Sequence, residues 1–237
     1  MAVGVACVWT TPSFAQGTIE KNLATTGRKG PAPPAGQPDL MEFNWIAGGG
    51  PTVWNDYQLT PEGDKRFKAY DFKKDDPSYT CTGSSWTRIY LNPNVLIHFT
   101  QGTDFVRMQY EWMDIDRRLP LSNPLDPNPK RVKIPKHPAL GASAAWYEGN
   151  TLVIDTIDFT PGYVSTIDVR AGLPQSTRMH TIERLYRDGD VLVIETTHID
   201  AANYRTPVVT NIRYRKTDWD LMKYGCDPKE AQVVSPN

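Results

Sequence analysis

The feature that most constrains the fold is a succession of short segments rich in β-branched and aromatic residues. Tight turns separate several of them, namely Gln101-Gly102-Thr103, Glu148-Gly149-Asn150 and Asp188-Gly189-Asp190. Turns of this kind join antiparallel neighbours as hairpins. The predicted strands are 95–100, 104–112, 144–147, 151–157, 178–186, 191–197 and 206–215. The pattern predicts an all-β protein, either an antiparallel barrel or a sandwich.

The alternation of residues within these strands favours the barrel. In 178–186, His180, Arg184 and Tyr186 share one face and Glu183 lies on the other, so neither face is cleanly apolar. A sandwich core needs one dry face per strand, whereas a ligand-holding barrel tolerates a partly polar lumen. Residues 60–70 have a helical pattern that opens with Pro61. We therefore predict an antiparallel barrel with one short helix and long proline-rich loops.

The N-terminal residues differ in character from the rest. Residues 1–9 are largely apolar, and Ser13-Phe14-Ala15 before Gln16 resembles a signal-peptide cleavage site. We predict a signal peptide over residues 1–15, truncated at its basic end; the alternative is an apolar first strand. A flexible arm over 16–40, rich in Gly and Pro, and a single barrel domain over 41–237 would follow. The expected location is periplasmic or secreted.

Charge and cysteine content narrow the partners. Lys plus Arg number 26 and Asp plus Glu 27, without a clustered basic surface, so we expect no nucleic-acid partner. No apolar run is long enough for a transmembrane helix. Cys7 would leave with the signal peptide, so Cys81 and Cys226 are either one disulfide or two free thiols. The oligomeric state stays open, a homodimer included.

Motifs for cofactors and nucleophilic catalysis are missing from the sequence. It contains no G-x-S-x-G, G-x-G-x-x-G or P-loop pattern, and its four histidines lack the paired spacing of a metal site. We therefore expect neither a nucleotide cofactor nor a metal. A proline-rich stretch over 119–129 is too long for a hairpin turn, and we expect it to be a loop over one end of the fold.

The remaining candidates are polar side chains on strands. His180 is the candidate base, because histidine exchanges protons near neutral pH. Glu111 or Asp155 would orient it, and Arg117 or Arg184 would stabilise developing negative charge. The candidate ligand-binding side chains are Met108, Tyr110, Trp112, Trp146 and Tyr186. The alternatives are structural: cross-strand ion pairs for the charged residues, a hydrogen-bonded core position for His180, and a solvent-facing Asp155.

The segment from Trp146 to Thr156, WYEGNTLVIDT, resembles the W-E-G-D-T-L-V-V-D/E-T signature of a large family of exported, mostly uncharacterised bacterial β-barrel proteins. The resemblance covers about residues 40–230 and implies a lipocalin-like barrel. Further matching pieces, in chain order, are LTPEG at 59–63, Asp76-Pro77, Cys81, Tyr110-Glu111, Arg117 or Arg118, GLPQS at 172–176, His180, Glu183-Arg184, Asp200, Tyr204, Pro207 and Cys226.

The chain departs from the family pattern at two places. The family's D-G-R-x-H-P stretch is replaced by the proline-rich region, in which only His137-Pro138 remains, and Asn150 stands where aspartate is usual. We expect a cofactor-independent lyase, isomerase or cyclase acting on a small apolar, aromatic or terpenoid-like molecule in the barrel. A carrier of an apolar ligand and an envelope interaction module are the alternatives, since one fold serves all three.

Overall fold

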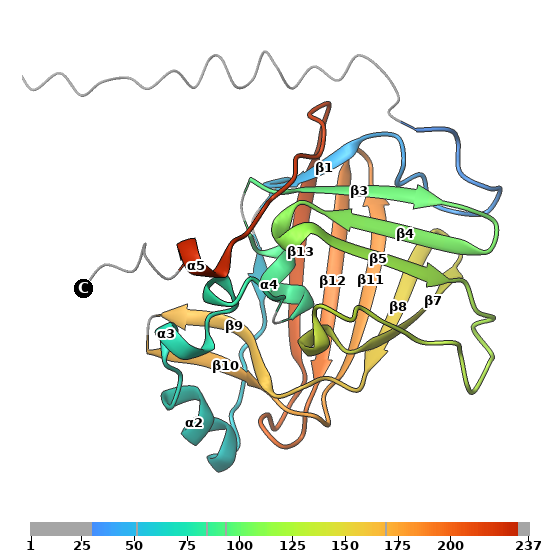
Figure 1. Cartoon of the computed structure of the whole chain (residues 1–237). Helices are drawn as coiled ribbons and strands as arrows, with labels where there is room; N and C mark the ends of the chain where they lie inside the picture. The colour runs from blue at the N-terminus through green and yellow to red at the C-terminus, as the bar shows by residue number, and fades with distance from the viewer. Residues whose placement is uncertain (1–29, 51, 84, 93, 169, 232–237) are drawn as a thin grey trace, which may run out of the picture.

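The chain forms a nearly closed antiparallel barrel in the computed structural model, which describes residues 30–231 apart from 51, 84, 93 and 169. The expected signal peptide and most of the expected arm lie outside the described residues. Figure 1 shows the strands β3, β4 and β5 crossing one side of the barrel and β13, β12, β11 and β8 lining the other. The lipocalin-like barrel expected from the sequence is confirmed.

The main sheet has eleven strands in the order β5-β4-β3-β1-β13-β12-β11-β8-β7-β6, with β2 paired to β13. Leu121, directly after β5, forms a parallel bridge with Ala145 of β7, which brings the two ends of the sheet together. The strand bounds are β1 Asn44–Ala47, β2 Val53–Trp54, β3 Leu96–Gln101, β4 Phe105–Tyr110, β5 Ile115–Pro120, β6 Val132–Lys133, β7 Ala142–Glu148, β8 Thr151–Ile157, β11 His180–Asp188, β12 Val191–Ile199 and β13 Val208–Thr217.

Several strands were not predicted. The strand β5 lies where the sequence shows charged residues and the start of the proline-rich stretch, so that loop begins only after Pro120. A separate hairpin, β9 (Gly162–Asp168) with β10 (Ala171–Gln175), was also missed, because glycine and proline interrupt its pattern. These strands are stabilised by pairing with distant segments, which a local pattern does not show.

The interior of the barrel changes from polar to apolar along its axis. Across the adjacent strands β7, β8, β11, β12 and β13, one inward row reads Ser143, Thr156, Thr181, His198 and Val208. Four residues further along the strands, the inward row is Tyr147, Leu152, Leu185, Ile194 and Ile212. A partly polar lumen was expected from the mixed strand faces, and the buried side chains confirm it.

The short helix α4 (Trp86–Tyr90) enters the polar half of this interior. Its residues Trp86, Thr87, Ile89 and Tyr90 are buried, and it lies beside β9 at the end of the barrel that carries the hairpin (Figure 1). Thr87 hydrogen-bonds to His198 (2.7 Å), and the hydroxyl of Tyr214 donates to the carbonyl of Tyr90 (2.6 Å). Side chains of α4 thus occupy space in which a bound ligand was expected.

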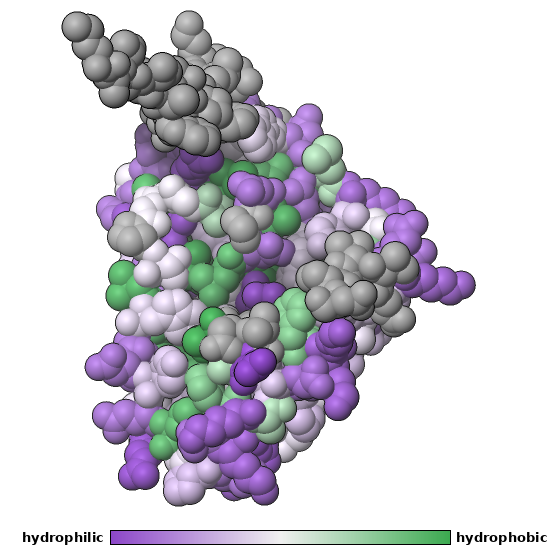
Figure 2. Space-filling view, turned by 90° about the vertical axis from the view of Figure 1, so that its left-hand side faces the viewer, coloured by the Kyte–Doolittle hydropathy of each residue, from purple (hydrophilic) through white to green (hydrophobic). Residues whose placement is uncertain are grey.

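The other helical segments lie outside the barrel. The predicted helix is α2 (Pro61–Lys68), which begins at the N-cap Thr60, whose hydroxyl accepts from the amide of Gly63 (3.0 Å). The rest are single turns: α3 (Phe72–Asp75), η1 (Pro77–Tyr79), η2 (Trp112–Asp114), η3 (Pro138–Leu140) and α5 (Pro228–Ala231). Figure 2 looks onto the end with α3, α5 and the β9–β10 hairpin, where apolar residues gather between hydrophilic ones.

The last part of the expected arm packs on the barrel. The amide of Leu40 donates to Gln101 (2.9 Å), and Gln37 donates to the carbonyl of Gly102 (3.0 Å). Within the described residues, no helix is both long and apolar enough to cross a bilayer.

The buried His198 predicts acid sensitivity. Burial lowers the pKa of His198 from 6.5 to about 3 in the folded chain. Below pH 6.5 the unfolded chain binds a proton that the folded chain does not, so stability present above pH 6.5 is lost progressively down to pH 3. Between pH 7.5 and 4.5 we expect His198 to account for a loss of about 2–3 kcal/mol in the free energy of unfolding. Urea unfolding of the wild type and His198→Gln at both pH values measures it; equal losses in the two proteins would contradict it.

Candidate functional site

The structure pairs the predicted base with one of its two predicted partners. Nε2 of His180, at the start of β11, lies 2.7 Å from Oδ2 of Asp155 on the neighbouring strand β8. The second carboxylate oxygen of Asp155 lies 2.5 Å from Nη1 of Arg131, which also donates to the Asp155 carbonyl (2.8 Å). The three side chains form a connected row of base, carboxylate and guanidinium.

The electrostatics of this row favour an ionised carboxylate. Partial burial raises the pKa of Asp155, but the hydrogen bonds and charges of His180 and Arg131 outweigh it, and the net pKa is lowered. An ionised Asp155 accepts the Nε2 proton of a neutral His180 ring, which leaves the lone pair on Nδ1. His180 is 37% exposed and Asp155 only 14%, so the ring is accessible while its partner is largely covered.

Two isoleucines on the neighbouring strands flank His180. It lies opposite Ile199 of β12, and the register of β11 with β8 places Ile157 on its other side. Ile157 and Ile199 are 38% and 40% exposed, unusually high for isoleucine. Ile182, two residues along the same face, lies between Asp155 and Thr197. An apolar molecule resting on these isoleucines would lie beside the imidazole ring.

A second polar cluster lies inside the barrel and is fully buried. Arg117 of β5 binds both carboxylate oxygens of Glu183 on β11, at 3.0 and 2.8 Å. Its Nη2 also donates to the hydroxyls of Ser143 (2.6 Å) and Thr156 (3.1 Å). The hydroxyl of Tyr90 donates to Glu183. The carboxylate of Glu183 and both Nη atoms of Arg117 are thus bonded within the cluster, whereas Nε of Arg117 is buried with no hydrogen-bond partner among the described residues.

Aromatic rings enclose the same cluster. The guanidinium carbon of Arg117 lies 3.6 Å from the ring centroid of Trp86. The hydroxyls of Tyr90 and Tyr110 are 3.1 Å apart. Burial and the charge of Glu183 raise the pKa of Tyr90 well above 10, so it stays protonated and donates. Burial alone would lower the pKa of Arg117, but Glu183 more than offsets this, and the net pKa of Arg117 is raised.

The structure separates residues that were grouped in the sequence hypothesis. Arg117 points inward, whereas His180 and Arg184 lie on the outer face of β11, where burial alternates with the inward Thr181 and Glu183. The sequence left open which face of this strand points inward, and the structure places His180 on the outer face, away from the lumen in which a substrate was expected. Arg184 pairs with Glu148 (2.9 Å) on the outer wall.

The remaining predicted residues divide between the two faces. Glu111 is buried and accepts from the amides of Leu96 (2.9 Å) and Met222 (2.7 Å), so it holds backbone segments together rather than His180. The predicted ligand-binding residues Met108, Tyr110 and Trp112 are buried in the core. Trp146 donates to Glu148 (2.9 Å) and Tyr186 to Glu195 (3.3 Å), both on the outer wall.

Some residues of these clusters were missed from the sequence. Arg131 lies directly before β6 at the end of the proline-rich region, and no pattern there indicates a partner for Asp155. Trp86 and Tyr90 lie in a five-residue helix too short to produce a periodic signal. Glu183 was considered only as a member of a cross-strand ion pair. It lies three residues after His180, and an odd spacing along a strand places two side chains on opposite faces, so the sequence did carry a signal for its orientation.

Comparisons with known proteins add no further assignment. No protein-family model matches the chain, and neither the curated proteins nor the solved structures searched contain a match. Membership of the exported β-barrel family suggested by the sequence therefore stays a prediction, and the function must be argued from the geometry of the site.

Proposed function

We propose that this protein is a cofactor-independent acid–base enzyme, a lyase, isomerase or cyclase, acting outside the cytoplasm on a small apolar, aromatic or terpenoid-like molecule. The observation that carries the proposal is the 2.7 Å contact between His180 and Asp155, with the imidazole ring still partly exposed. The substrate would rest on the outer wall beside His180, not in the lumen.

The chemistry requires one group that transfers a proton and a second group that fixes the orientation of the first. His180 would accept a proton at Nδ1 while Asp155 stabilises the imidazolium through Nε2. Arg131 keeps the carboxylate in position, and Ile157 and Ile199 supply an apolar surface for the substrate. The disulfide between Cys81 and Cys226 supports an oxidising compartment, since such bonds are rare in the cytosol.

The proposal predicts a large loss of turnover when His180 is replaced. His180→Ala should lower turnover about 100-fold or more, because a positioned general base contributes at least that factor. Asp155→Asn should lower it less, because the ring remains but loses its carboxylate. The measurement is mass spectrometry of a mixed aromatic and terpenoid library after incubation with each protein.

The matched control is Arg213→Gln, which removes an exposed ion pair with Asp188 elsewhere on the outer wall. We expect it to retain wild-type turnover and stability. Undiminished turnover in His180→Ala would refute the assignment of the base. Library members that bind and return unchanged from the wild type would instead establish a carrier.

A further inference from the structure

A surface pocket of about 330 Å³ shares no lining residue with the His180–Asp155–Arg131 site and is lined by Asp114, Asp116, Ile134, Pro135, Lys136 and His137. It includes the one element of the family's histidine–proline stretch that the sequence keeps. This volume has room for on the order of ten non-hydrogen atoms, judged by the roughly 30 Å³ that a water occupies in the liquid. The pocket is therefore large enough for a small aromatic molecule.

His137 presents a defined hydrogen-bond donor at this pocket. The residue is 4% exposed, and its Nδ1 accepts a hydrogen bond from the amide of Gly83 (2.9 Å). Because Nδ1 is an acceptor, the proton of the neutral ring is on Nε2. None of the described residues accepts a hydrogen bond from that Nε2–H. Burial and the nearby charge of Lys136 lower the pKa of His137, which is consistent with a neutral ring.

The unengaged donors around the pocket favour a ligand with an acceptor or a negative group. Lys136 contributes an exposed ammonium group. The oxygens of the two acidic residues are already engaged: Asp114 accepts from the amides of Tyr224 (2.8 Å) and Gly225 (3.1 Å), and Asp116 is bound by Arg107. The donors left for a ligand are Nε2 of His137 and Nζ of Lys136, beside the apolar Ile134 and Pro135.

We propose that this pocket binds a small organic monocarboxylate, with the carboxylate at His137 and Lys136 and the apolar body against Ile134 and Pro135. This site is independent of His180: neither its residues nor its ligand class depend on the acid–base reaction. A positive or negative binding result at this pocket therefore does not affect the proposed acid–base function.

Benzoate is the probe, and benzyl alcohol, which has the same ring but no charge, is the matched control ligand. NMR of the full chain should show saturable shifts of the His137 ring resonances with benzoate and none with benzyl alcohol at equal concentration. Calorimetry should show a dissociation constant about tenfold higher or more in His137→Phe, which loses a hydrogen bond to a charged group. The exposed Lys136→Gln should weaken binding severalfold.

The control variant is Lys130→Gln, in the loop before the pocket, which should bind benzoate like the wild type. His137→Phe also removes the acceptor for the amide of Gly83. If that variant fails to fold, the affinity of Lys136→Gln and the ring shifts of the wild type decide the question. Absence of ring shifts, equal shifts with benzyl alcohol, or unchanged affinity in Lys136→Gln would each overturn the proposal.

Discussion

Replacing Arg117 with alanine is expected to lower the free energy of unfolding by about 3–5 kcal/mol. The substitution leaves the carboxylate of Glu183 fully buried, with the Tyr90 hydroxyl remaining but its guanidinium partner gone. An uncompensated charge in a low-dielectric interior accounts for most of this loss. Urea unfolding at pH 7.5, followed by tryptophan fluorescence and circular dichroism, measures the effect.

A double variant separates the charge from the packing. Arg117→Met combined with Glu183→Leu removes both charges while keeping apolar bulk, so it should recover most of the stability lost in the single variant. Arg213→Gln, at an exposed ion pair, should change the free energy of unfolding by less than about 1 kcal/mol. A loss as small as this in Arg117→Ala would show that the pair is not buried as described.

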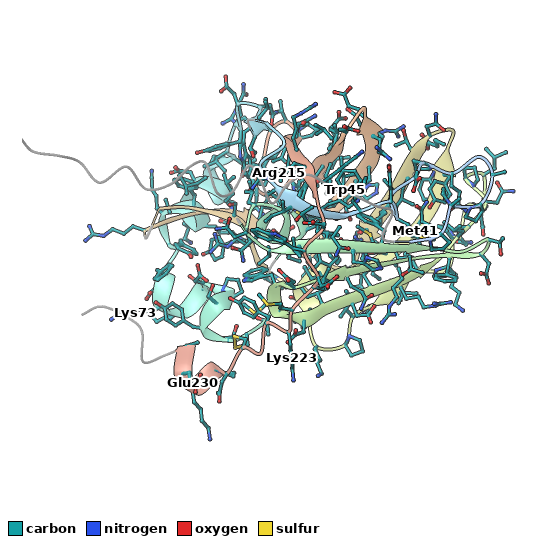
Figure 3. All side chains as sticks on the ribbon, turned by 90° about the horizontal axis from the view of Figure 1, so that it is seen from above. Met41, Trp45, Lys73, Arg215, Lys223 and Glu230 are labelled. Atoms are coloured by element: carbon teal, nitrogen blue, oxygen red, sulfur yellow. A yellow bond between two sulfur atoms is a disulfide. The ribbon has the colours of Figure 1, made fainter. Side chains whose placement is uncertain are left out.

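Removing the Cys81–Cys226 disulfide is expected to cost up to about 5 kcal/mol. The bond joins residues 145 positions apart, and the entropy of closing so long a loop in the unfolded chain gives this estimate, at the upper end of the usual 2–5 kcal/mol. The C-terminal segment with Lys223 and Glu230 lies on the same side of the molecule as α3, which carries Lys73 (Figure 3). The measurement is denaturant unfolding of the oxidised wild type against Cys81→Ser with Cys226→Ser.

The wild type under reducing conditions is the control for that pair of substitutions. It should unfold at the same denaturant concentration as the double serine variant, because both lack the cross-link. Without the disulfide, the C-terminal segment would keep other contacts, such as those from Glu111 to Met222 and from Asp114 to Tyr224. A stability difference below about 1 kcal/mol between oxidised and reduced protein would contradict the expected contribution of the bond.

The barrel was predictable because short stretches of sequence specify most of its strands and turns. Strands such as β8 and β12 carry β-branched residues between glycine-containing turns, and the structure places both where the sequence does, with β12 two residues longer than predicted. The hairpin partners follow from the turns, since a short turn makes sequential strands neighbours. The cysteine pair was left open by the sequence, because two cysteines alone do not show that their backbones meet.

The site was less predictable because it depends on which strand face points inward. Asp155 was one of two partners considered for His180, and the structure brings these two together. The sequence could not decide whether His180 points into the lumen, because both faces of its strand carry polar and apolar residues. Shifting the inward face by one residue exchanges every side chain between core and solvent. Arg117 could be identified as a candidate, whereas its contact with Glu183 joins strands that lie six places apart in the sheet order.

The most direct test of the proposed chemistry is incorporation of solvent deuterium. The wild type, incubated with the aromatic and terpenoid library in deuterium oxide, should add deuterium to at least one member or its product, because a general base returns a solvent-derived proton to carbon. Mass spectrometry detects the added mass, which His180→Ala should abolish and Arg213→Gln should leave in place. Library members that bind the wild type yet return with unchanged mass would contradict the acid–base account.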